Sequence, residues 1–170
     1  IELSPGTSVA GVTTRNVCCS TEVELCRENI LGGSARALVV NAGNSNAFTG
    51  YRGREAVEVI TAQVAAHLGC AQSEVFVSST GVIGVPLPTD KAREGLRAAF
   101  DAPLCSWEDA ANTISTTDTF AKGARTSAVV DATTDKNTPP NSNPEASITG
   151  HTEVTAGNTV ATPSRPHSTA

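Results

Sequence analysis

The spacing of apolar positions changes several times along the first half of the chain. Residues 36–40 contain a short apolar run that ends before Asn41, which is typical of a buried strand. Residues 55–68 place apolar side chains at every third or fourth position and are followed by Gly69, which predicts an amphipathic helix with a glycine stop. Residues 74–78 (EVFVS) predict a second strand.

Three more elements are predicted after the second strand. Thr89 can cap a helix over residues 90–100, and residues 106–114 open with a Ser and an Asp spaced to cap another helix. Residues 124–130 predict a further strand. The order strand, helix, strand, helix, helix, strand is typical of a layered α/β fold.

The last part of the chain has a different composition. Residues 131–170 contain no Phe, Trp or Tyr, but hold nine Thr and five of the nine Pro. Such a segment has little apolar area to offset the entropy lost on ordering. We therefore expect residues 1–130 to form the domain and residues 131–170 to form a poorly ordered Thr/Pro-rich tail.

Charge and cysteine content exclude several classes of protein. The net charge is −5 and the 12 Lys and Arg are scattered, so we expect neither a nucleic acid partner nor a membrane surface. No apolar run of about 18 residues predicts a membrane span. The five cysteines include no CxxC spacing, which argues against a zinc site and favours a reducing, cytoplasmic location.

Three polar segments could carry chemistry. Residues 41–50 (NAGNSNAFTG) form either a tight surface loop or a loop that lines a pocket at a strand end. Residues 78–84 (SSTGVIG) form either a simple strand-ending turn or a turn whose N–H groups, with the Thr80 hydroxyl, face an oxyanion near Gly81. Residues 116–120 (TTDTF) either hold an amino group or end a helix.

These segments together resemble one family, and they occur in its order. Residues 11–16 (GVTTRN), 37–50 (ALVVNAGNSNAFTG), 79–88 (STGVIGVPLP) and 116–122 (TTDTFAK) are similar to the "GVFTxN", "ALVVNxGNANAxTG", "STGVIGxxLP" and "TTDTxPK" motifs of the ornithine acetyltransferases, also called glutamate N-acetyltransferases. The resemblance covers roughly residues 8–130. It implies an α/β sandwich built from two chains, of which this would be the α chain.

The resemblance also implies a reaction. Members of the family are cytoplasmic precursors that cut themselves before a Thr, which becomes the N-terminal nucleophile of a β chain and moves acetyl from N-acetylornithine to glutamate through an acetyl-enzyme. It implies that Thr80 and Gly81 form the oxyanion hole and that Thr116 contacts substrate. No metal or cofactor is implied, and acetyl-CoA enters only as an alternative acetyl donor.

The chain departs from the family pattern after residues 148–150 (ITG). The substrate-binding Lys and the nucleophilic Thr that should follow have no counterpart, and Thr162 does not replace the nucleophile because Pro163 follows it. Three explanations stay open: a frameshift after Gly150, a decayed copy, or a separate α-like chain that needs a β partner.

Two other functions also stay open at this point. An N-terminal-nucleophile amidohydrolase would release acetate or an amine without using glutamate as acceptor. An inactive fragment or binding module would bind ligand without turnover. For the acetyltransferase, the nucleophile is not among these 170 residues.

Overall fold

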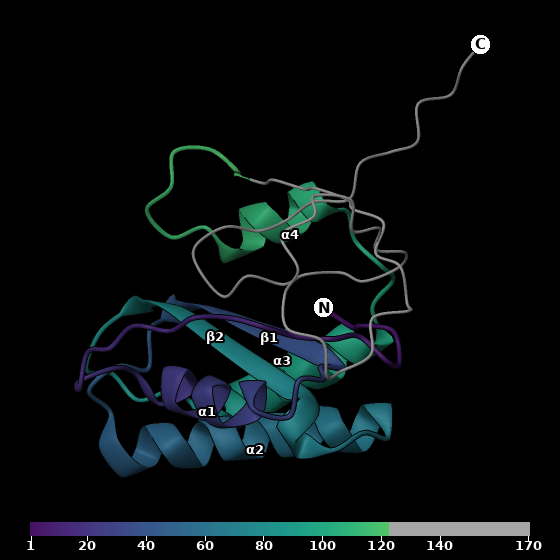
Figure 1. The fold of residues 1–170 in the computed structure, drawn as a ribbon. Coiled ribbons are helices and arrows are strands. Elements are labelled where there is room, and N and C mark those ends of the chain that lie inside the picture. Colours follow the sequence, from purple (N-terminus) through teal and green to yellow (C-terminus); the bar gives the residue numbers. More distant parts are fainter. Residues whose placement is uncertain (123–170) are drawn as a thin grey trace, which may run out of the picture.

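The computed structural model describes residues 1–122, in which helices surround a small parallel sheet (Figure 1). The sheet consists of β1 (Ala37–Asn44) and β2 (Val75–Val82). The other elements are α1 (Thr21–Ile30), α2 (Gly50–Leu68), the 3-10 turn η1 (Gln72–Glu74), α3 (Thr89–Asp101) and α4 (Trp107–Ile114). In Figure 1, α4 lies on the opposite side of the sheet from α2. The predicted α/β class is confirmed.

The two strands are parallel, with Ala37 opposite Val75, and α2 makes the crossover between them. Both sheet faces are covered. Val39 and Val77 pack against α2 and α3, whereas Leu38 and Phe76 face a second cluster with the N-terminal segment and α1. Coverage on both sides explains why the strands appear in the sequence as continuous apolar runs without polar alternation.

Helix α2 supplies much of the core. Ala56, Val57, Ile60 and Val64 lie on one face at helical spacing, and all four are buried. Burying a side chain such as Ile60 contributes about 2 kcal/mol. The helix ends as predicted, at Gly69 with φ +63°.

The predicted start of this helix, residue 55, is wrong, because α2 begins at Gly50. Gly50 and Gly53 are poor helix formers and obscure the first turns in the sequence. Gly53 is needed there for a steric reason. A Cβ at Gly53 would lie 2.0 Å from Thr49 Oγ1 and 2.9 Å from Asn46 Oδ1.

Helix α1 was not predicted, and its buried side chains explain the omission. It lies along β2 and presents Glu22, Cys26 and Asn29, of which two are polar. Asn29 Nδ2 donates to the Val75 carbonyl at 3.0 Å, and Cys26 Sγ donates to the Val77 carbonyl at 3.4 Å. The helix therefore satisfies backbone groups of an edge strand, and polar side chains at two of its three buried positions weaken the apolar stripe by which helices are usually identified.

The two later helices form where predicted, and α4 has the expected cap. The predicted cap of α3 at Thr89 is wrong, because Thr89 lies inside the helix, Pro88 holds the N-cap position and no side chain caps the helix. The Asp109 N–H donates to Ser106 Oγ at 3.0 Å, and the Ser106 N–H donates back to Asp109 Oδ2 at 3.2 Å. The Ser106 hydroxyl also donates to Asp109 Oδ2 at 2.6 Å, and this bond, together with the bond from the Ser106 N–H, lowers the pKa of the Asp109 carboxyl. The predicted strand at residues 124–130 and the predicted tail at residues 131–170 lie outside the described residues. No helix within residues 1–122 is long and apolar enough to cross a membrane.

The burial of Cys26 gives a first testable prediction. Removal from water raises the pKa of the Cys26 thiol. Because the thiolate is the reactive form, we expect Cys26 to resist iodoacetamide at pH 8 in the folded chain and to react in urea. Exposed Cys18 and Cys105 serve as internal controls and should react in both conditions. Peptide mass spectrometry measures each site, and equal labelling of Cys26 and Cys18 in the folded chain would contradict the structure.

Candidate functional site

Thr80 and Gly81 lie near the carboxyl end of β2, beside the carboxyl end of β1. The register places Thr80 opposite Ala42 and Gly81 opposite Gly43. Thr80 is half-buried and Gly81 is exposed. In parallel α/β sheets this edge is where ligands most often bind, since the loops leaving the strands open there.

The predicted strand-ending turn at residues 78–84 is wrong, because β2 continues to Val82. The strand is irregular at this end: the register shifts at Gly43 and Asn44, and Gly81 has φ +129°. A Cβ at Gly81 would lie 2.4 Å from the carbonyl carbon of Gly43. The two backbones therefore approach so closely that only glycine fits. The irregularity changes the direction in which the peptide groups of this strand end point.

The Asn-rich segment of residues 41–50 does not wholly follow the first strand as predicted, because β1 continues through its first four residues to Asn44. Asn41 and Asn44 line a groove, as expected of a segment that lines a pocket at a strand end. Asn46, in contrast, is fully buried with φ +49° and acts structurally. Its N–H donates to Asn44 Oδ1 at 2.9 Å, its Nδ2 donates to the Gly53 carbonyl at 3.1 Å, and it accepts from Thr49 Oγ1.

A buried carboxylate that the sequence did not reveal joins the two strand ends. Glu22 is only 2% exposed. Its Oε1 accepts from Asn46 Nδ2 at 2.9 Å and from Ser79 Oγ at 2.7 Å. Ser79 immediately precedes Thr80, so Glu22 links the loop after β1 to the predicted oxyanion residues. Glu22 and Ser79 are 57 residues apart, and no local pattern connects them.

Thr116 is exposed in the segment that follows α4. The predicted hydroxyl cluster around Asp118 is not formed within the described residues. Asp118 instead pairs with Lys122 Nζ at 2.5 Å. Thr116 lines neither of the hollows described below.

A groove of about 590 Å³ adjoins the strand ends. Its walls come from β1, the segment after β2, and α3, and they are mostly apolar, with Lys91 as the charged side chain. Gly43, which pairs with Gly81 across the sheet, lines the groove, and so does Val82, which follows Gly81 in the chain. The predicted oxyanion residues therefore lie at the border of a hollow large enough for a small molecule or a short peptide segment.

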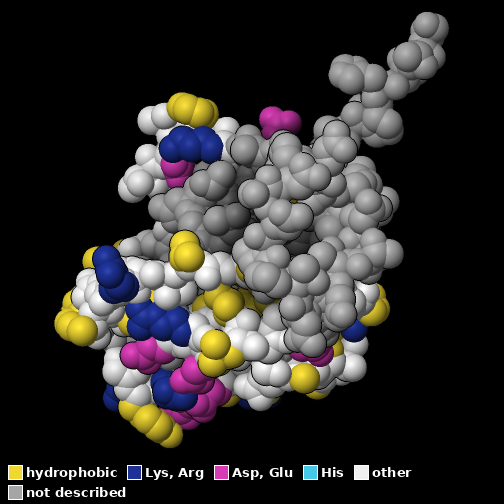
Figure 2. Space-filling view, in the orientation of Figure 1, with side chains coloured by type: hydrophobic (Ala, Val, Ile, Leu, Met, Phe, Trp, Pro, Cys, Tyr) yellow, Lys and Arg dark blue, Asp and Glu magenta, His cyan; other side chains and the backbone are white. Residues whose placement is uncertain are grey.

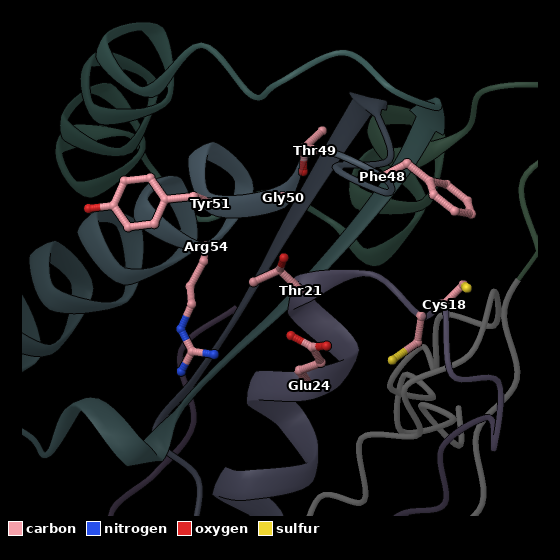
Figure 3. A pocket seen from close by; sticks show the side chains of 9 residues that line it. Cys18, Thr21, Glu24, Phe48, Thr49, Gly50, Tyr51 and Arg54 are labelled. Carbon is pink, nitrogen blue, oxygen red and sulfur yellow. The ribbon is translucent and has the colours of Figure 1, made fainter.

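A second hollow of about 300 Å³ lies between the starts of α1 and α2 (Figure 3). Glu24, Arg54, Tyr51 and Phe48 are among its lining residues. Tyr51 is 80% exposed. Thr80, Gly81 and Thr116 do not line this hollow, whereas residues 48–50 of the Asn-rich segment do.

Neither a charged surface patch nor a group of metal ligands marks a further site on the described residues. On the face shown in Figure 2, basic and acidic side chains of the described residues are interspersed and form no broad patch of one sign. Within residues 1–122 no group of three or more His, Cys, Asp or Glu could hold a metal ion. The predicted absence of a nucleophile concerns residues 131–170, including Thr162, and lies outside the described part of the chain.

The covered parallel strands and the polar strand ends define an α/β protein with a candidate site at the carboxyl edge of its sheet. Comparison with known proteins identifies the group to which it belongs. The model of the ArgJ family matches residues 1–137. The chain belongs to the ArgJ family.

Individual relatives agree. The arginine biosynthesis bifunctional protein ArgJ of Zymomonas mobilis is 66% identical over 121 residues, which are 71% of this chain and 30% of that protein. The protein of the same name from Rhizobium meliloti is 50% identical over 124 residues, or 72% of this chain and 30% of that protein. The chain thus spans about 30% of the length of the curated relatives it matches.

Solved structures give the same fold. The arginine biosynthesis bifunctional protein ArgJ of Bacillus halodurans matches with a TM-score of 0.60 and 33% identity, over 68% of this chain and 62% of that one. The ornithine acetyltransferase of Mycobacterium tuberculosis, solved in complex with ornithine, matches with a TM-score of 0.60 and 32% identity, over 68% of this chain and 64% of that one.

Proposed function

We propose that this chain is the α part of an acetyltransferase of arginine biosynthesis that moves acetyl from N-acetylornithine to glutamate, with acetyl-CoA as an alternative donor. Membership of the ArgJ family supports the assignment. The observation that carries it is the close approach of Gly81 to Gly43 at the border of a groove, beside the half-buried Thr80. A glycine forced into this place leaves its N–H unshielded by a side chain.

The chemistry proposed for this strand end is oxyanion stabilisation. Attack of a nucleophile on the acetyl carbonyl forms a tetrahedral intermediate with negative charge on oxygen. The Thr80 hydroxyl and the Gly81 N–H would donate hydrogen bonds to that oxygen, which accelerates acyl transfer because the bonds strengthen as charge develops. Thr116 would contact the substrate, brought to the site from the segment after α4. The reaction needs no cofactor.

The nucleophile would come from a β chain. This chain spans about 30% of its curated relatives, so most of the protein that they represent has no counterpart here. An N-terminal Thr suits the reaction, since its own α-amine, with an ordinary pKa near about 7.7, can take the proton from its hydroxyl. The acetyl group would pass to this Thr, ornithine would leave, and glutamate would then accept the acetyl group.

The experiment is co-expression of this chain with a chain that carries the family's Lys and Thr region. The purified pair should transfer acetyl from N-acetylornithine to glutamate, measured as N-acetylglutamate formed. Release of free acetate without a glutamate requirement would favour an amidohydrolase instead. Substrate binding without turnover by a folded pair would favour an inactive binding module and contradict the proposal.

Thr80→Val tests the assigned role directly. It keeps the shape of the side chain and removes the donor, so kcat of the pair should fall about a hundredfold while the fold persists. Ser78→Ala, which removes a hydroxyl from the same strand two positions earlier, is the matched control and should leave kcat nearly unchanged. Equal activity of Thr80→Val and the parent pair would remove Thr80 from the proposed oxyanion hole.

A further inference from the structure

We infer that Glu22 is a positioning residue for the acetyl-transfer site: through Ser79 and Asn46 it fixes the strand ends that carry Thr80 and Gly81. This inference rests on the proposed function and adds to it a residue that the motifs do not mark. It depends on the burial of Glu22, on its two hydrogen bonds, and on its place in a ladder of side chains along β2.

The ladder sets the position of Glu22. Glu22, Cys26 and Asn29 lie on one face of α1 and meet alternate residues of β2, at Ser79, Val77 and Val75 respectively. At Val75 and Val77 the helix side chains donate to strand carbonyls. At Ser79 the direction reverses, and the strand's hydroxyl donates to the helix carboxylate at 2.7 Å. The last rung therefore holds a side chain of the strand immediately before Thr80.

The second bond of Glu22 reaches the other strand. Asn46 Nδ2 donates to the same oxygen, Oε1, at 2.9 Å. Asn46 in turn fixes the loop after β1, where the Ser45 N–H donates to the Val82 carbonyl at 2.9 Å. One carboxylate oxygen thus ties the segments on both sides of the irregular Gly43–Gly81 contact. Bonds to a charged acceptor are shorter and stronger than bonds to a neutral one, which suits a group that holds geometry.

The remaining oxygen of Glu22 argues for a functional role over a purely stabilising one. Glu22 Oε2 is buried and makes no hydrogen bond within residues 1–122. A buried carboxylate with an unpartnered oxygen costs stability, and folded proteins retain such groups mostly where function needs them. We therefore expect the carboxylate to matter more for the rate of acetyl transfer than for the stability of the fold.

The test is a double-mutant cycle in the co-expressed α–β pair. Glu22→Gln keeps the shape of the side chain but weakens its bonds to Asn46 and Ser79. Ser79→Ala removes the hydroxyl that bonds Glu22 next to Thr80. Each should lower kcat roughly tenfold, with KM for N-acetylornithine within roughly twofold and the unfolding temperature nearly unchanged. In a Thr80→Val background either change should lower kcat less than roughly twofold further, because the donor that it positions is already gone.

Asn29→Ala is the matched control. It breaks the same ladder at its far end, so it should lower the unfolding temperature and leave kcat of the folded pair unchanged. The inference is overturned if Glu22→Gln leaves kcat unchanged. It is also overturned if Glu22→Gln lowers kcat by the same factor in the parent pair and in the Thr80→Val pair. A parent pair that forms but transfers no acetyl would overturn the proposed function itself, which is a separate and distinguishable result.

Discussion

Gly81→Ala is expected to prevent stable folding of the chain. The added Cβ would lie 2.4 Å from the carbonyl carbon, 2.6 Å from the carbonyl oxygen of Gly43 and 2.7 Å from the Asn44 nitrogen. All three are backbone atoms of β1, so no side-chain rotation relieves the overlap. The residue also has φ +129°, which L side chains rarely adopt. Together these effects should cost about 5 kcal/mol or more, an amount comparable with the whole stability of a small domain.

Gly43→Ala separates the cost of backbone strain from the cost of steric overlap. Gly43 has φ +105°, but a Cβ there would meet nothing within 4 Å. Its cost should be confined to backbone strain, about 1–3 kcal/mol. Urea unfolding followed by circular dichroism measures both variants. If Gly81→Ala were no less stable than Gly43→Ala, the close contact of the two strand ends would not exist in solution.

The strands show where sequence patterns stop being informative. Val75 and Val77 identify β2 because apolar side chains continue while both sheet faces are buried. The strand then continues through Ser78 to Gly81, residue types that favour turns. Pairing with β1 overrides that preference, because the backbone groups of each strand form hydrogen bonds with those of the other. The polar half of each strand, and with it the setting of Thr80, was therefore predicted as turn or loop.

Helix α1 could not be identified for a different reason. Hydrophobic periodicity finds a helix that packs its side chains on apolar side chains. Asn29 and Cys26 pack on the carbonyl groups of an edge strand, and Glu22 packs on a hydroxyl and an amide. Two of the three buried side chains of α1 are therefore polar, and in the sequence this face resembles an exposed one. Long-range contacts of this kind appear only when both elements are placed.

Sequence motifs likewise indicate some residues of the candidate site and miss others. Thr80 and Gly81 are predicted as site residues from the motifs that contain them, and they lie at a strand end beside a groove. The contact of Thr116 with substrate rests on the resemblance alone, because Thr116 is exposed and is not among the residues that line the groove. Glu22 belongs to no motif. Its role follows only from its bonds to residues that lie 24 and 57 positions away.

Asn46→Asp is expected to be the second most damaging change, although it alters hardly any atom position. The Nδ2 group of Asn46 donates to Glu22 Oε1 at 2.9 Å and to the Gly53 carbonyl at 3.1 Å. An oxygen in its place turns both contacts into repulsions and sets two buried carboxylates against each other. Leaving a buried charge opposed in this way should cost about 4 kcal/mol at pH 8. Aspartate tolerates the positive φ of this position, so backbone strain adds little.

The loss should depend on pH with a defined sign. Two carboxylates that share a buried site retain a proton more readily, so the pKa of the introduced carboxyl is raised in the folded state. A raised folded-state pKa gives stability that is complete below the unfolded pKa, about 4, and is lost as the pH rises through the folded value. Chemical unfolding at pH 5 and pH 8 should therefore show a smaller deficit relative to the parent chain at pH 5.

Glu22→Gln combined with Asn46→Asp provides the control for this interpretation. The glutamine amide can donate to the new carboxylate, which reverses the direction of the bond between the same two positions. The double variant should recover much of the stability at pH 8 and lose most of the pH dependence, giving a coupling energy of about 2 kcal/mol. If instead the two changes added without coupling, Glu22 and Asn46 would not be neighbours, and the buried link between the strand ends would not exist.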